Sequence, residues 1–166
     1  MKAFKPVGGL EVRSSPIQGR GCFTTRAIKK GTWILEYTGR RIRLQEANAL
    51  YHTRPSTYLF GLADGHTVID GVGMASLINH SCEPNCESVE DNGRIFFAAL
   101  RSIAAGEELT FDYNLGNSNE REMPCGCGAR NCRGTLYSKR ELAIRRKRER
   151  LNSGVQKKVN SSHSRG

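Results

Sequence analysis

The stretch INHSCEPNC, residues 78–86, places an asparagine, a histidine and two cysteines within nine positions. The next cysteines follow in PCGCGARNC, residues 124–132. Two interpretations of these clusters are open. The cysteines are either ligands of a structural zinc ion that joins distant parts of the chain, or ordinary buried or disulfide-paired residues.

The length and charge of the chain limit both interpretations. With 166 residues the chain can bury a hydrophobic core without metal, so a zinc ion would act locally. The net charge is +10, and residues 139–166 hold ten Lys and Arg against two Glu. The body is therefore nearly neutral. The basic tail is typical either of a nuclear-localisation or nucleic-acid-binding segment or of a solvated helix face.

Apolar runs of signal-peptide or membrane-spanning length are absent from the sequence. We therefore expect neither export by a signal peptide nor a membrane span. The expected location is intracellular, either cytoplasmic or nuclear and chromatin-associated. In a bacterium it would be cytoplasmic, or that of a secreted effector without a signal peptide. In a reducing compartment six cysteines are more often thiols or metal ligands than disulfides, which favours zinc.

Short β-prone runs bounded by glycines dominate the body and predict a mostly β domain of irregular architecture with small helices. Asn92-Gly93 lies between two β-prone runs and predicts a hairpin. Leu44, Ala47 and Tyr51 are at helical spacing and predict a short helix. The predicted strands lie in GGLEVRSS (8–15), GRGCF (19–23), GTWILEYTGRRI (31–42), STYLFGL (56–62), HTVIDG (66–71), CESVEDNGRIFFAAL (86–100) and GEELTFDY (106–113).

The composition changes after the last cysteine. Ser138 and Glu141 form a capping box ahead of LAIRRKRERL, residues 142–151, which predicts a helix. The remaining residues are rich in Ser, Asn, Gly and Lys and predict disorder. We therefore expect a main domain over 1–120, a cysteine-containing segment over 121–137, and a basic tail, first helical and then disordered, over 138–166.

Cys125, Cys127 and Cys132 lie on one glycine-rich loop and can reach a single ion. A closed tetrahedral zinc site needs a fourth ligand, which this loop lacks. His52 and His163 are poor candidates, since one stands alone beside the predicted helix and the other lies in the tail. The fourth ligand is expected to be Cys82 or Cys86, which share one compact polar turn.

Six motifs occur in the order typical of one family. The chain resembles the SET-domain lysine methyltransferases with a zinc-binding post-SET segment, over about residues 10–137. The resemblance implies a SET-domain fold of small sheets. In it, the end of FDY passes beneath a loop near NHSC to form a pseudoknot. The motifs are SPIQGRGCF, GTWILEYTG, YLF, INHSCEPNC, GEELTFDY and CGCGARNCRGTL.

The resemblance also implies the ligands and the residues that bind them. The cofactor is S-adenosylmethionine, and the zinc ion connects the post-SET loop to the turn that holds this cofactor. Cys22 and Cys86 then remain free thiols. The implied cofactor-binding residues are Gln18, Arg20, Tyr58, Asn79, His80 and Leu136, and the implied zinc ligands are Cys82, Cys125, Cys127 and Cys132.

The sequence departs from the family pattern in three places. Tyr58 and Asn79 are closer in sequence than is usual, which reduces the strand that flanks the substrate peptide. Ser76 and Leu77 replace the arginine and aromatic residue that usually precede INH, which affects contacts to the cofactor carboxylate. Residues 1–21 contain no cysteine, so the cysteine-rich segment that precedes the domain in relatives is not expected.

The resemblance assigns the chemistry to three aromatic residues. The hydroxyl of Tyr113 would orient the substrate amine and stabilise charge, and Tyr37 would line the other side of the lysine channel. Phe111 is at a position where a tyrosine would hold a water molecule, so a phenylalanine predicts di- or trimethylation. Asp112 adjoins Tyr113, but alternation along an extended segment favours a structural role for it.

Two functions are therefore open. The first is a protein-lysine N-methyltransferase acting on histones or other lysine-rich proteins. The second is an inactive zinc-stabilised module that binds chromatin or nucleic acid through its basic tail, by contacts that are salt-dependent and nonselective. The presence of Tyr113, Asn79 and His80 favours the enzyme. The oligomeric state is not predicted.

Overall fold

The structure is a computed structural model that describes residues 4–52, 58–116 and 123–163, with side chains as far as Leu151. The chain forms two compact units. The first comprises Met1–Asp112 with Gly126–Cys132, and the second comprises Tyr113–Cys125 with Arg133–Gly166. None of the described helices is long and apolar enough to cross a membrane.

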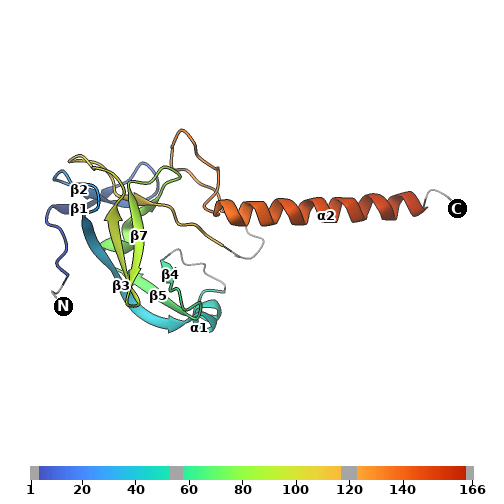
Figure 1. Cartoon of the computed structure of the whole chain (residues 1–166), viewed down its shortest axis with the longest axis horizontal. Helices are drawn as coiled ribbons and strands as arrows, with labels where there is room; N and C mark the ends of the chain where they lie inside the picture. The colour runs from blue at the N-terminus through green and yellow to red at the C-terminus, as the bar shows by residue number, and fades with distance from the viewer. Residues whose placement is uncertain (1–3, 53–57, 117–122, 164–166) are drawn as a thin grey trace. The chain divides into compact units, whose positions relative to one another are not determined.

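Strands are the main secondary structure of the first unit (Figure 1). An antiparallel pair is formed by β1 (Leu10–Ser14) and β2 (Arg20–Thr24). The other strands form one sheet in the order β4-β5-β3-β8-β7-β9-β6, and the prediction of a mostly β fold is confirmed. These strands are β3 (Trp33–Arg43), β4 (Leu59–Gly61), β5 (Thr67–Val72), β6 (Asn79–His80), β7 (Cys86–Asp91), β8 (Arg94–Ala99) and β9 (Thr110–Phe111).

The long strand β3 gives the sheet its curl. Its first half, from Trp33 to Tyr37, pairs with β8, and its second half, from Thr38 to Arg43, pairs with β5. The register shifts between Trp33 and Leu35, an irregularity that bends a strand and increases its twist. Because its two halves have different partners, the long strand connects two parts of the curled sheet, as Figure 1 shows.

The predicted hairpin is confirmed at Asn92-Gly93, which connects β7 to β8. Both residues have positive φ angles, 51° and 71°, as the tightest hairpin turns require. Phe97 and Ile95 of β8 are almost completely buried, and with Ile34 of β3 they form part of the core. The tight turn thus pairs the largely exposed β7 with the buried β8 without a long loop.

Strand β9 lies between β6 and β7 and is parallel to both. His80 and Cys86 each pair with Phe111, one on either side. The connecting turn, residues 81–85, therefore crosses the line of β9 directly after Phe111, and the N–H of Ser81 donates to the carbonyl of Phe111 at 3.1 Å. The pairing of Phe111 on both sides agrees with the crossing near NHSC that the resemblance implied.

The described helices are few. The predicted short helix is confirmed as α1 (Leu44–Leu50), whose buried Ala47 packs against Ile42 and Val68. A 3-10 turn, η1 (Met74–Leu77), precedes β6. In the second unit α2 (Lys139–His163) begins where the capping box places it, and it extends beyond Leu151, where the sequence predicts the helix to end.

Candidate active site and metal centre

The glycine loop, residues 15–20, lies against Asn79 of β6. The N–H of Ser15 donates to the carbonyl of Gly19 at 2.9 Å and closes the turn. The side-chain amide of Asn79 donates to the carbonyl oxygens of Gln18, at 3.2 Å, and Arg20, at 3.1 Å. The structure therefore brings together three of the residues predicted to bind a cofactor.

Glu108 completes this arrangement, although the sequence reasoning assigned it no role. Its carboxylate accepts hydrogen bonds from the hydroxyl of Ser15, at 2.8 and 2.9 Å, and from Nδ2 of Asn79, at 2.7 Å. Gly21 lies so close that a Cβ there would overlap this carboxylate. One feature of the sequence could have indicated this role. Glu108 is a charged residue directly before the apolar Leu109, and a charged side chain near the core needs polar partners.

Asn85 is a second residue that the sequence reasoning missed. Its side chain is buried, accepts from the N–H of Thr110 at 2.9 Å and donates to the carbonyl of Glu108 at 2.7 Å. These two bonds attach the turn 81–85 to the segment that leads into β9. An asparagine in a turn is common, so no sequence signal marked this one.

His80 is buried between two polar groups. Its Nδ1 lies 3.6 Å from the carboxylate of Asp112, and its Nε2 lies 3.3 Å from the sulfur of Cys82. The structural role expected for Asp112 agrees with this contact. His80 thus pairs with Phe111 through its backbone and contacts the cysteine cluster through its ring.

An aromatic cluster surrounds Tyr37. The hydroxyl of Tyr37 donates to the carbonyl of Tyr58 at 2.5 Å, and its ring centroid lies 5.3 Å from that of Phe60. Phe111 lies 4.7 Å from Phe97, which also contacts Tyr37. Tyr58 is 46% exposed, and its carbonyl is the group that accepts from Tyr37.

Tyr113 and Leu136 belong to the second unit, and both are half-buried. Within that unit the N–H of Leu115 donates to the carbonyl of Leu136 at 3.2 Å, and the N–H of Leu136 donates to that of Met123 at 2.9 Å. These bonds fix the backbone of Leu136. The roles predicted for Tyr113 and Leu136 stay predictions.

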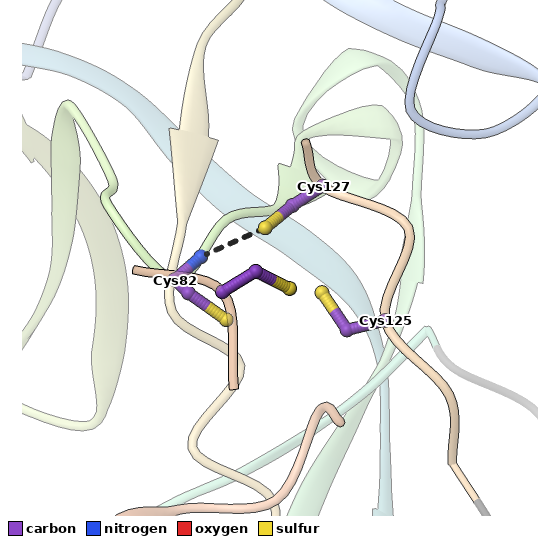
Figure 2. A group of neighbouring side chains, drawn as sticks. Cys82, Cys125 and Cys127 are labelled. Atoms are coloured by element: carbon purple, nitrogen blue, oxygen red, sulfur yellow. Dashed lines mark hydrogen bonds between the residues drawn. The ribbon is translucent and has the colours of Figure 1, made fainter. Parts of the chain in front are cut away.

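Four cysteine sulfurs, from Cys82, Cys125, Cys127 and Cys132, lie within 4.8 Å of one another. Three of these side chains are labelled in Figure 2. Tetrahedral zinc with Zn–S bonds of about 2.3 Å requires sulfurs about 3.8 Å apart, so the cluster fits this ion. The N–H of Cys82 points to the sulfur of Cys127 at 3.5 Å, and such contacts stabilise a metal-bound thiolate.

The two other cysteines lie outside this group. Cys22 and Cys86 are free and almost completely buried, and burial raises the pKa of each thiol to about 12. A thiol with such a pKa is a poor metal ligand and a poor nucleophile at neutral pH. Of the two candidates for the fourth position, Cys82 is therefore the one within reach of the other three sulfurs.

Comparison with known sequences gives consistent matches. The sequence model of the SET domain matches residues 19–114. The chain is 41% identical over 136 residues to a histone-lysine N-methyltransferase, H3 lysine-4 specific, from Saccharomyces cerevisiae, which covers 74% of this chain. It is also 41% identical over 143 residues to the histone-lysine N-methyltransferase ash1 from Drosophila melanogaster, which covers 79% of this chain. The matched region is only 12% and 6% of the lengths of these two relatives.

A solved structure is similar over most of the chain. It is the crystal structure of KRYPTONITE in complex with mCHH DNA, an H3(1-15) peptide and SAH. The TM-score is 0.66 and the sequence identity 27%, and the match covers 81% of this chain and 30% of that chain.

Proposed function

Because the chain belongs to the SET-domain family, we propose that it is an S-adenosylmethionine-dependent protein-lysine N-methyltransferase that acts on histones or other basic proteins. The observation that carries this proposal is the similarity to histone-lysine N-methyltransferases over about three quarters of the chain. The gathering of Gln18, Arg20 and Asn79 around one loop supports it.

The glycine loop and the strand beside it would hold the cofactor. Gly19 has a φ of 50° and open space where a side chain would extend, so a ligand can approach its backbone closely. Gln18, Arg20, Asn79 and His80 would contact the cofactor from this side, with Tyr58 and Leu136 as further contacts. When bound, S-adenosylmethionine supplies an electrophilic methyl group.

The chain must then present a neutral lysine amine. A free lysine, with a pKa of about 10.4, is almost wholly protonated at pH 7. The apolar rings of Phe60, Phe97 and Phe111 next to Tyr37 would disfavour the ammonium form by desolvation. Tyr37 would line one side of the channel, and the Tyr113 hydroxyl would orient the amine for in-line displacement.

The remaining assignments follow from the same proposal. Zinc would be held by Cys82, Cys125, Cys127 and Cys132, and the product would be di- or trimethyl-lysine because of Phe111. The domains would be the SET domain over 1–120, the post-SET zinc segment over 121–137 and the basic tail over 138–166. The protein would act in the nucleus on chromatin, with its tail as a nonselective nucleic-acid contact.

Methyl transfer from labelled S-adenosylmethionine to histones tests the proposal. The wild-type chain should label a histone, and Tyr113→Phe should lower the rate by at least about a hundredfold, as is typical when a preorganised donor is removed. Tyr51→Phe is the control, since it removes a tyrosine hydroxyl that donates to Asp70 at 2.6 Å and has no proposed role in the reaction. A wild-type chain that binds DNA but transfers no methyl group to any histone would instead be the inactive binding module.

A further inference from the structure

We infer that Glu108 is a positioning residue for the cofactor loop, a role that rests on the proposed function. Its carboxylate holds the glycine loop, residues 15–20, and Asn79 in one fixed arrangement. Glu108 itself need not touch the cofactor. It acts through the groups that do.

The carboxylate connects two segments that are far apart in the sequence. Oε1 accepts from the hydroxyl of Ser15 at 2.8 Å and from Nδ2 of Asn79 at 2.7 Å, and Oε2 accepts from the same hydroxyl at 2.9 Å. The Ser15 oxygen in turn accepts from the N–H of Ile17 at 3.0 Å. Removing the carboxylate would therefore take one partner from the turn and one acceptor from the amide of Asn79, and would loosen both.

Glu108 is one of three acceptors that fix which way the amide of Asn79 faces. A carboxylate can only accept hydrogen bonds, so it selects the NH₂ end of the amide rather than the oxygen. That same NH₂ group then donates to the carbonyls of Gln18 and Arg20. With the amide reversed, its oxygen would face three acceptors, and the loop would no longer be held against β6.

The position of Glu108 is fixed by its surroundings. Its carbonyl accepts from the side chain of Asn85 at 2.7 Å, and its backbone forms a β-bridge with Phe23. On the other side Gly21 leaves no room for a Cβ. A rigid backbone and close packing thus give the carboxylate one place to lie, as positioning of a ligand loop requires.

Glu107 offers a matched control at the neighbouring position. Its carboxylate pairs with Arg101 at 2.8 Å and accepts from the N–H of Ala104 at 2.6 Å. In the part of the chain that the structure describes, Ser15 and Asn79 bond to Glu108 rather than to Glu107. Glu107→Gln and Glu108→Gln therefore remove the same charge from adjacent residues, but only the second alters the loop.

The experiment compares both variants and Ser15→Ala with the wild type. Calorimetry with S-adenosylhomocysteine should show that Glu108→Gln weakens binding by at least about tenfold, the effect expected for a charge-assisted hydrogen bond. Glu107→Gln should bind within about twofold of the wild type. At saturating S-adenosylmethionine the kcat of Glu108→Gln should stay near that of the wild type, because only binding is impaired.

Hydrogen exchange of the amides in residues 15–20 gives a readout that does not need the cofactor. Exchange should accelerate in Glu108→Gln and Ser15→Ala, and the effect of the double variant on affinity should be smaller than the sum of the two single effects, because the two residues share one contact. Unchanged affinity and unchanged exchange in Glu108→Gln, beside a wild type that binds cofactor, would overturn the role of Glu108 alone. A wild type that binds neither S-adenosylmethionine nor S-adenosylhomocysteine would overturn the proposed function, whatever the exchange shows.

Discussion

Phe111 belongs to both the core and the proposed lysine channel. Its ring packs against Phe97 at 4.7 Å and against Phe60 at 6.0 Å, and its backbone pairs with His80 and Cys86. Core packing explains why the residue is apolar. The absence of a hydroxyl would also leave room beside the amine for a further methyl group.

Phe111→Tyr separates these two roles. If the ring lines the channel, the variant should add the first methyl group at a rate close to that of the wild type and then stop, which mass spectrometry of a histone peptide would detect. A purely structural residue would instead give lower stability and an equal fall in every methylation step. A wild type that stops at monomethyl-lysine after exhaustive reaction would contradict the assignment.

The role of a single residue could be predicted where one short segment contained the whole motif. The cysteine spacing indicated zinc ligands, and Asn79 was placed beside Gln18 and Arg20 by resemblance. The roles of Glu108 and Asn85 could not be predicted. Their partners are distant in the sequence, and only the fold brings them close: Ser15, Asn79 and Thr110. A carboxylate has no sequence pattern that names a distant partner.

Gly71 of β5 leaves the space that the side chain of Tyr37 of β3 occupies. A Cβ at Gly71 would overlap the ring and hydroxyl of Tyr37, so only glycine lets this tyrosine reach the carbonyl of Tyr58. Gly71→Ala should destabilise the chain by about 1–3 kcal/mol through overpacking.

Urea denaturation measures this change, and methyl transfer should fall with it as Tyr37 moves. Gly61→Ala is the control, since the space around Gly61 of β4 is open and an added methyl group meets nothing there. Equal stability of the two variants would mean that Tyr37 does not depend on Gly71.

Secondary structure was predictable where local chemistry decides it. The Asn92-Gly93 hairpin, helix α1 and the start of α2 lie where turn residues, helical spacing and Ser138 placed them, and the hydroxyl of Ser138 accepts from the N–H of Glu141 at 3.0 Å. The place of β9 between two parallel strands follows from contacts between distant segments. Periodicity and propensity carry no information about such pairing, so only the family resemblance indicated it.

For the whole molecule, metal should matter more for activity than for folding. We expect one zinc ion per chain by metal analysis. Chelation should abolish methyl transfer before circular dichroism reports loss of the sheet, because the core of the first unit is formed by residues that do not depend on zinc.

Cysteine variants provide the controls for this prediction. Cys82→Ser should lower the zinc content, whereas Cys22→Ser and Cys86→Ser should not, since these two buried thiols lie outside the cluster. Active protein that contains no zinc would refute the metal assignment.

Helix α2 should supply the nucleic-acid contact. Arg145 must be left in place, because its guanidinium stacks 3.9 Å from the ring centroid of Tyr137 and its Nε donates to Glu141. The three cations that follow it are exposed. Replacing Arg146, Lys147 and Arg148 by Gln should weaken DNA binding. The slope of log K against log salt should fall by about 0.9 for each phosphate that the variant no longer neutralises.

The control replaces Lys29 and Lys30, two exposed cations in the first unit, and the changes in slope are compared per charge removed. Fluorescence anisotropy with a labelled duplex at several salt concentrations measures both slopes. If the helix variant keeps the affinity and slope of the wild type, another surface binds the DNA.

The position of β9 late in the sequence affects when the sheet can be completed during synthesis. Among the described strands β6 has β9 as its only neighbour, so a nascent chain that ends before Thr110 has nothing to pair with Asn79 and His80. Nonlocal pairing of this kind forms late and slowly. Almost the entire first unit is therefore synthesised before Asn79 can pair with β9, and a chain that ends before Thr110 would lack the strand that holds Asn79 beside the glycine loop.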